Sequence, residues 1–204
     1  MSGATTATTS ATRCCRRAAT GAATTSSSPA TAPPARPLPA GYTVRAFAGE
    51  SEIDSRTEAH RSAFHPSKMT VALHRRVMAS PTYRPEFDLV CAAADGRIAA
   101  CTIVWFDEVN RVGIFEPVAC HAEHQRRGLA SALMTEGLRR LHARGATAAL
   151  VMSHLEDSPG GHTYRRLGFE VIGRLHEWKK TAWPDAGRDD AAAHGGAQRE
   201  AAPR

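Results

Sequence analysis

The sequence has 204 residues, of which 42% are hydrophobic and 23% are charged, and its formal net charge is +6. This length suits one domain of ordinary size. No apolar run approaches the ~20 residues of a membrane-spanning helix, and none resembles a secretory segment behind Arg16-Arg17. The basic residues are spread over predicted helix faces without an aromatic and basic platform. We therefore expect a cytoplasmic protein with no membrane partner and no nucleic-acid partner.

The two ends of the chain lack the pattern of a folded segment. Residues 1–40 consist mostly of Ala, Thr, Ser and Pro, and they contain no acidic residue. Such a segment cannot bury enough apolar surface to offset its ordering entropy, and the tail after Pro184 is similar in kind. We expect a disordered leader over 1–40, one folded domain over 41–182 and a disordered tail over 183–204. The arginines of the leader leave an organellar targeting segment as the alternative.

Between these ends, apolar periodicity and turn signals predict a series of helices and strands. Strands are predicted over 42–47, 87–93, 97–106, 111–120, 148–152 and 169–178. Helices are predicted over 51–64, 69–79, 127–143 and 161–167. Asp95-Gly96 is a strong hairpin signal inside an antiparallel meander of three strands. The order β-α-α-β-β-β-α-β-α-β indicates an α+β fold.

Cysteine and histidine positions do not indicate a metal site. The cysteines lack C-x-x-C spacing, and reduced thiols are expected for all of them: Cys14, Cys15, Cys91, Cys101 and Cys120. Four of the histidines are scattered without the spacing of a metal site: His121, His124, His154 and His162. Solvated or locally hydrogen-bonded imidazoles are expected there, and no metal.

The segment from Val118 to Ala130 joins an apolar strand, a short polar loop and the start of a long amphipathic helix. The first N–H groups of a helix have no partner within the helix, so together with the macrodipole they can hold a phosphate. Gly128 and the small Ala130 leave room for a ligand to approach the main chain. The segment therefore predicts a site for an anionic ligand at the helix start, although its spacing matches neither common nucleotide-binding glycine motif.

A later strand and a short helix complete a recognisable order of motifs. The helix ends in Tyr164-Arg-Arg-Leu-Gly168-Phe169, and the earlier loop reads Gln125-Arg-Arg-Gly128-Leu-Ala130. In this order the chain resembles the GNAT superfamily of acetyl-CoA-dependent N-acetyltransferases, whose motifs are Q/R-x-x-G-x-G/A and Y-x-x-x-G-F. The resemblance implies a mixed, mostly antiparallel sheet with a central splayed parallel strand pair and helices on both faces. It also implies acetyl transfer from acetyl-CoA to an amine by direct attack in a ternary complex.

Pro117 lies inside a strand that should be central, where a missing N–H weakens the ladder and favours a bulge. In the GNAT fold the corresponding strand is bulged and diverges from its parallel neighbour, which leaves main-chain groups free to pair with the pantetheine arm. The resemblance assigns this role to Val118, Ala119 and Cys120. The alternative is that Pro117 ends the strand early.

The resemblance also assigns the remaining contacts to the two substrates. The pyrophosphate is assigned to the main chain of Gln125, Arg126, Arg127, Gly128, Leu129 and Ala130. Ser158 stands where relatives often have an asparagine that contacts the cofactor arm, and serine is shorter. Analogy of fold assigns the acceptor to the first helix pair and its connection, including Phe64 and His65.

Acetyl transfer from a thioester to an amine needs a neutral amine, a polarised carbonyl and a proton for the departing thiolate. An amine of pKa ~10.4 is protonated at pH 7, so a carboxylate must remove a proton directly or through water. Glu116 is the candidate base, because residues 114, 116, 118 and 120 are expected to share one face of a strand. The base of some relatives falls nearer Ile114, so an orienting or structural role for Glu116 is the alternative.

The other two needs have candidates as well. The N–H of Val118 or its neighbour is placed to polarise the carbonyl, as in an oxyanion hole. Tyr164 matches the family's acid, and its alternative role is packing at the sheet edge. The expected acceptor is a small-molecule or peptide amine, and the expected state is a monomer or homodimer. A non-catalytic acyl-CoA sensor on the same fold is the competing function.

Overall fold

The computed structural model describes residues 20–27, 33–153 and 157–176. The strands are β1 (Thr20–Ser27), β2 (Tyr42–Ala46), β3 (Asp88–Ala93), β4 (Ile98–Asp107), β5 (Val112–Cys120), β6 (Ala148–Ser153) and β7 (Glu170–His176). The α-helices are α1 (Ile53–Ala63), α2 (Val71–Met78), α3 (Leu129–Ala143) and α4 (Pro159–Arg166). Short 3-10 turns are η1 (Gly49–Glu52), η2 (Pro85–Phe87) and η3 (Ala122–His124).

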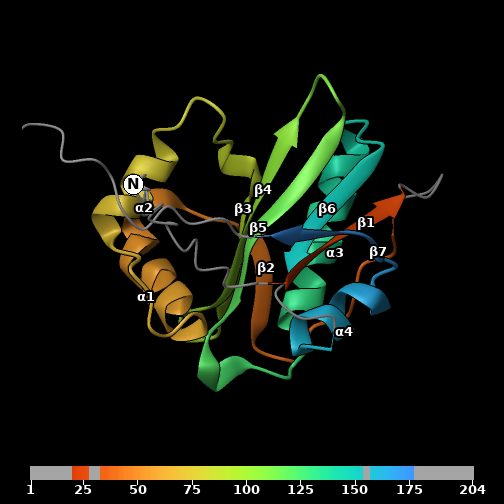
Figure 1. Cartoon of the computed structure of the whole chain (residues 1–204). Helices are drawn as coiled ribbons and strands as arrows, with labels where there is room; N and C mark the ends of the chain where they lie inside the picture. Colours follow the sequence, from red (N-terminus) through yellow and green to blue (C-terminus); the bar gives the residue numbers. More distant parts are fainter. Residues whose placement is uncertain (1–19, 28–32, 154–156, 177–204) are drawn as a thin grey trace, which may run out of the picture. The chain divides into compact units, whose positions relative to one another are not determined.

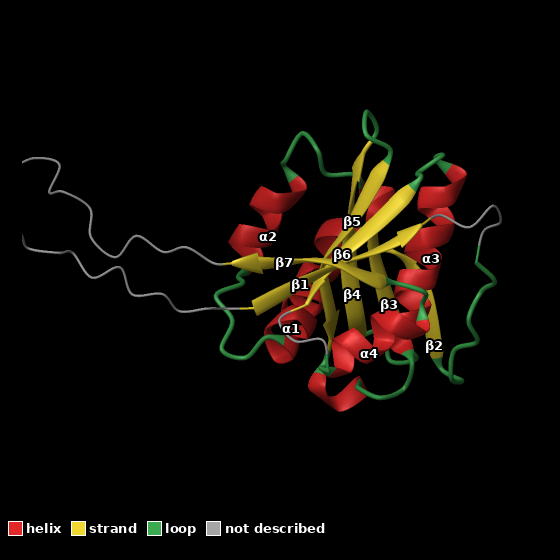
Figure 2. Ribbon diagram, turned by 45° about the vertical axis from the view of Figure 1, so that its right-hand side comes forward, coloured by secondary structure: helices red, strands yellow, loops and turns green. Residues whose placement is uncertain are grey.

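The strands form one sheet in the order β2-β3-β4-β5-β6-β1-β7. Every neighbouring pair is antiparallel except β5 and β6, which are parallel. Helices α1 and α2 lie on one side of the sheet, and α3 and α4 lie on the other (Figures 1 and 2). The predicted α+β order and the mixed, mostly antiparallel sheet are therefore confirmed. In the part of the chain that the structure describes, no helix has the length and apolar character needed to span a membrane.

Two apolar clusters hold the helices against the two faces of the sheet. On one face, Leu129, Leu133 and Leu141 of α3 pack with Leu89 and Phe115 of the strands. On the other face, residues of α1 pack with Val90, Cys101 and Ala119, and Ile53 and Ala59 are the buried residues that α1 contributes. The amphipathic character predicted for the long helix is confirmed, because α3 buries Leu129, Leu133, Gly137 and Leu141.

A buried charged group also joins α1 to β3. The Arg56 side chain donates from Nε to Asp88 Oδ1 at 3.1 Å, and both residues are at most 1% exposed. Tyr83 donates its hydroxyl to the other oxygen of Asp88 at 3.0 Å. Burial is the largest cause that raises the pKa of Tyr83, so the phenol remains a donor at neutral pH. A carboxylate with these two donors fixes α1 over the sheet.

The prediction of a leader without structure is wrong for residues 20–27. These residues form β1, which pairs with β6 through Ala22↔Ser153 and with β7 through Thr20↔His176. Main-chain hydrogen bonds accept almost any side chain, and threonine suits a strand, so apolar periodicity gives no signal for such a segment. The folded region begins upstream of residue 41, whereas residues 183–204 and the first part of the leader lie outside the described residues.

Gly137 lets α3 approach the sheet closely. A Cβ at this position would lie 2.5 Å from Phe115 Cε1 and 3.1 Å from Val104 Cγ2. Phe115 is 2% exposed, so its ring has little space to move. The missing side chain therefore sets the packing distance between helix and sheet.

Gly137→Ala is expected to lower the free energy of unfolding by about 1–2 kcal/mol, because overpacking exceeds the gain in helix propensity. Urea denaturation measures this loss. Gly160→Ala is the control, because a Cβ at Gly160 meets its nearest atom at an ordinary 3.5 Å. Equal stability of the two variants would contradict the close packing of α3.

Candidate active site

The parallel pairing of β5 with β6 stops halfway along β5. The ladder runs from Val112↔Ala148 to Phe115↔Val151, whereas β5 continues to Cys120. On its other side β5 remains paired with β4 to the end, through Thr102↔Val118 and Ala100↔Cys120. Within the described residues, the edge of β5 from Val118 to Cys120 therefore has no ladder to β6. The predicted divergence of the parallel pair is present.

A bulge accompanies the divergence. Thr102 is opposite Val118 and Val104 is opposite Phe115, so Ile103 alone faces Glu116 and Pro117. The Glu116–Pro117 peptide bond is cis. The predicted irregularity at Pro117 is confirmed, and the alternative that Pro117 ends the strand is wrong, because β5 extends three residues further.

The bulge changes which residues share a face of β5. Phe115 belongs to the cluster under α3, and beyond the bulge Val118 and Cys120 pack against the same cluster. Ala119 belongs to the cluster under α1. The expectation that residues 114, 116, 118 and 120 share one face is therefore wrong, because a two-for-one bulge inverts the alternation. Glu116 is exposed, and its carbonyl accepts from Trp105 Nε1 at 3.0 Å.

The loop after β5 leads into α3 through two residues with left-handed backbone conformations. Arg126 has φ 59° and Gly128 has φ 78°. The helix therefore begins at Leu129, two residues later than the pattern predicts, and Gly128 caps it without a side chain. The first helical bond joins Ala132 N to Gly128 O at 3.0 Å, so the amides of residues 129–131 precede the helical ladder. This geometry suits an anion at the helix start.

Side chains of the loop hold its conformation. Arg127 donates from Nη1 to Tyr42 OH at 3.1 Å and from Nη2 to the carbonyl of Glu123 at 3.2 Å. Gln125 Nε2 donates to the carbonyl of Cys120 at 3.3 Å. The loop is thereby fixed to β2 and to the end of β5, whereas Arg126 is exposed. The side chains of Gln125 and Arg127 therefore stabilise the loop, and the main chain of the loop is available to bind a ligand.

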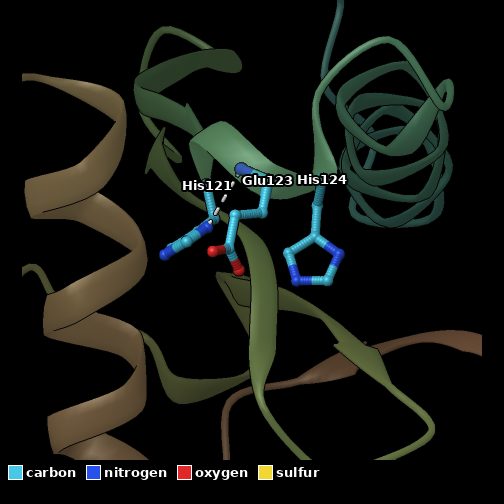
Figure 3. A group of neighbouring side chains, drawn as sticks. All are labelled: His121, Glu123 and His124. Carbon is cyan, nitrogen blue, oxygen red and sulfur yellow. Dashed lines mark hydrogen bonds between the residues drawn. The ribbon is translucent and has the colours of Figure 1, made fainter.

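The turn η3 between β5 and this loop brings two histidines and a glutamate together (Figure 3). His121 accepts from Glu123 N at 3.3 Å, and His124 Nδ1 lies 2.8 Å from Tyr42 OH. Burial is the largest cause that lowers the pKa of His124, followed by the positive charges around it. The hydrogen bonds of the His121 and His124 rings agree with the predicted local hydrogen bonding. His154 lies outside the described residues.

Tyr164 is on α4, which packs beside β6. The ring is 7% exposed and belongs to the cluster under α3. Burial raises the pKa of Tyr164, so its phenol keeps its proton beyond the usual range. Ser158 is the N-cap of α4, and its hydroxyl accepts from Gly161 N at 3.1 Å. The Ser158 oxygen thus has a structural role besides the predicted contact with the cofactor arm.

The two residues assigned to the acceptor lie at the end of α1. Phe64 is 43% exposed, and its ring centroid is 4.8 Å from that of His60. His65 follows it and is exposed. Both side chains are accessible, so their role in acceptor binding stays a prediction.

The cysteines of the described region are free thiols. Burial raises the pKa of Cys91 and of Cys120 to about 11. A thiol with this pKa is protonated at neutral pH and is a weak nucleophile. Cys120 therefore contributes its main chain and an apolar surface at the open edge of β5. Cys14 and Cys15 lie outside the described residues.

Comparison with known proteins agrees with this geometry. The family model described as an acetyltransferase (GNAT) domain matches residues 85–171. The mycothiol acetyltransferase of Cellulomonas flavigena is 31% identical over an alignment of 153 residues that covers 67% of this chain and 43% of the relative. The mycothiol acetyltransferase of a Nocardioides species is 32% identical over 164 residues, with 69% and 54% covered. The chain spans about half the length of these curated relatives.

Solved structures show the same fold. A GCN5-related N-acetyltransferase from Sphaerobacter thermophilus matches with a TM-score of 0.68 at 24% identity, covering 78% of this chain and 50% of that chain. The bulged central strand that leaves its parallel neighbour, followed by a glycine-capped helix, agrees with what the family resemblance implies for this part of the fold. The family match over residues 85–171, together with the similarity to the curated relatives, assigns this region to the GNAT superfamily.

Gly128→Val is expected to abolish binding of CoA while the fold survives, because a branched side chain covers the amides at the start of α3. The left-handed φ of Gly128 makes the substitution cost about 1–3 kcal/mol of stability. Isothermal titration with CoA measures the binding loss.

Gly96→Val is the matched control. Gly96 also has a left-handed φ, 85°, and like Gly128 it has no atom within 4 Å of a built Cβ. It lies in the β3–β4 hairpin, so this variant should lose similar stability and keep CoA affinity. Unchanged CoA affinity in Gly128→Val would contradict the placement of the site.

Proposed function

We propose that this chain is an N-acetyltransferase that moves an acetyl group from acetyl-CoA to an amine by direct attack in a ternary complex. The observation that carries the proposal is the open edge of β5 from Val118 to Cys120, which ends at the glycine-capped start of α3. An extended arm with amide groups can pair with such an edge as a strand does. A diphosphate at its far end meets the unpartnered amides of the helix start.

The cofactor contacts follow from this arrangement. Val118, Ala119 and Cys120 pair through their main chain with the pantetheine arm. The loop from Gln125 to Ala130 holds the pyrophosphate, largely through N–H groups, and Ser158 lies at the start of α4. Support comes from the side chains of Gln125 and Arg127, which fix the loop without occupying its main chain.

The chemistry divides among groups on three elements. The N–H of Val118 or a neighbour polarises the thioester carbonyl, because a fixed donor stabilises the charge that develops on oxygen. Glu116 takes the proton of the amine directly or through a water molecule. Its carboxylate is exposed, and it lies within the bulge beside the open edge. Tyr164 gives its proton to the departing thiolate, and no acyl-enzyme forms.

The acceptor is a small-molecule or peptide amine, with Phe64 and His65 on the acceptor side. The curated relatives are named mycothiol acetyltransferases, and we therefore include mycothiol-related amines among the candidate acceptors. A monomer or homodimer in the cytoplasm, with no membrane or nucleic-acid partner and no metal in the transfer step, completes the proposal.

An acceptor screen with the full chain tests the function. We expect steady-state release of free CoA from acetyl-CoA with at least one amine among polyamines, amino acids, peptides, aminoglycosides and mycothiol-related amines, and mass spectrometry should show the acetylated product. Gly128→Val is the control for background hydrolysis. Tight binding of acetyl-CoA without turnover on any amine would instead favour the non-catalytic sensor.

Tyr164→Phe should lower kcat by about tenfold to a hundredfold, a modest factor because a thiol of pKa ~8.5 leaves readily even without an acid. KM for acetyl-CoA should stay the same, since the phenol acts on the leaving group. Because burial raises the pKa of Tyr164, any fall of the wild-type rate through loss of this proton should occur at a higher pH than the ordinary phenol pKa of ~10 would give. An unchanged kcat in the variant would assign Tyr164 to packing alone.

A further inference from the structure

We propose that the turn η3 is a binding site for a divalent transition-metal ion, held by His121, Glu123 and His124. One potential donor atom from each residue lies within 4.8 Å of the other two. Figure 3 shows the Glu123 carboxylate between the two imidazole rings. His121 is the N-cap of this 3-10 turn and His124 is its last residue, so a single turn of the chain separates the two histidines.

The donor set selects the class of ion. Two imidazole nitrogens and one carboxylate oxygen suit Zn²⁺, Co²⁺ or Ni²⁺ better than Mg²⁺ or Ca²⁺. With bonds of ~2.0–2.1 Å, tetrahedral donors lie about 3.3 Å apart, so the three atoms must close in by roughly 1.5 Å. Rotation of the exposed Glu123 side chain and the half-exposed His121 ring allows this closure. A fourth position remains for water.

Tyr42 supplies the outer support that such a site needs. Its hydroxyl lies 2.8 Å from His124 Nδ1, which leaves Nε2 of this ring for the ion. The same hydroxyl oxygen accepts from Arg127 Nη1 at 3.1 Å, and a phenol oxygen can accept a second bond from His124 Nδ1–H. Metal-bound histidines commonly donate their other N–H in this way, which fixes ring and tautomer. His124 is 9% exposed, so its ring is also held by packing.

Two weak interactions compete with the ion. Arg97 Nη1 lies 3.6 Å from Glu123 Oε2, and these side chains are 60% and 67% exposed. Water screens such a pair, so it is weak. His121 must also give up its 3.3 Å bond from Glu123 N if Nδ1 is the ligand. We therefore expect that removal of the positive charge of Arg97 strengthens metal binding.

The test is a titration of the full chain with Co²⁺. Any affinity tag is removed first, and Cys14 and Cys15 are replaced by serine. Visible d–d absorption reports the ion, and Zn²⁺ competes for the same site. We expect one ion per chain. His121→Ala and Glu123→Gln should each weaken binding more than tenfold, and Arg97→Gln should tighten it severalfold.

The controls separate this site from general histidine binding. His162→Ala removes an exposed histidine on α4, outside the cluster, and should leave Co²⁺ affinity unchanged. His121 and Glu123 carry the test, because loss of the buried His124 could also disturb folding. Circular dichroism checks each variant. The proposal is overturned if the wild type shows no saturable binding, or if His121→Ala and Glu123→Gln bind as the wild type does.

A consequence for the cofactor rests on the proposed function. The residues from Gln125 to Gly128 follow the turn directly, so an ion there fixes the start of the pyrophosphate loop. Acetyl-CoA affinity should therefore change with Zn²⁺ in the wild type and not in His121→Ala. An equal response of both proteins would remove this coupling, and the Co²⁺ titration, which contains no CoA, judges the metal site by itself.

Discussion

The candidate site depends on one constraint: the ladder between β5 and β6 ends at Phe115 and Val151, while β5 keeps its pairing with β4 to Cys120. Glu116 and Pro117 together oppose Ile103, and the extra residue bends β5 away from one neighbour without freeing it from the other. Proline has no N–H to donate, so residue 117 could not continue a regular ladder on the donor side. Within the described residues, the open edge from Val118 to Cys120 thus follows from this short sequence.

The loop that follows has to be rigid and still leave its main chain accessible. Left-handed conformations at Arg126 and Gly128 delay the helix until Leu129, and the amides of residues 129–131 precede the helical ladder. The side chains of Gln125 and Arg127 donate hydrogen bonds to the carbonyl of Cys120 and to the hydroxyl of Tyr42, and these bonds stabilise the loop conformation. An anion that arrives at this loop meets amides already in place, which reduces the entropy lost on binding.

The sequence was sufficient to predict the elements whose side chains carry a periodic signal. The meander, the apolar stripe of α3 and the irregularity at Pro117 could be predicted because each reflects burial or a missing donor. Three features could not be predicted. Strand β1 pairs through main-chain hydrogen bonds, which require no apolar pattern in its sequence. The side chains of β5 change faces at a bulge, and the alternation of residues in the sequence does not show where the extra residue lies. The buried Asp88 accepts from Arg56, which lies 32 residues away on another element, as well as from the nearby Tyr83.

The residues around η3 show what sequence spacing alone does not reveal about the histidines. In an extended loop, His121, Glu123 and His124 would point in different directions, and the sequence motif would have no chemical meaning. The tight turn and the contact of His124 with Tyr42, 82 residues away, bring the donor atoms together. The same tyrosine also holds Arg127, so one hydroxyl joins the histidine turn to the start of the proposed pyrophosphate loop. Any ligand that changes the hydrogen bonding of Tyr42 therefore acts on both, because the two side chains share its single oxygen atom.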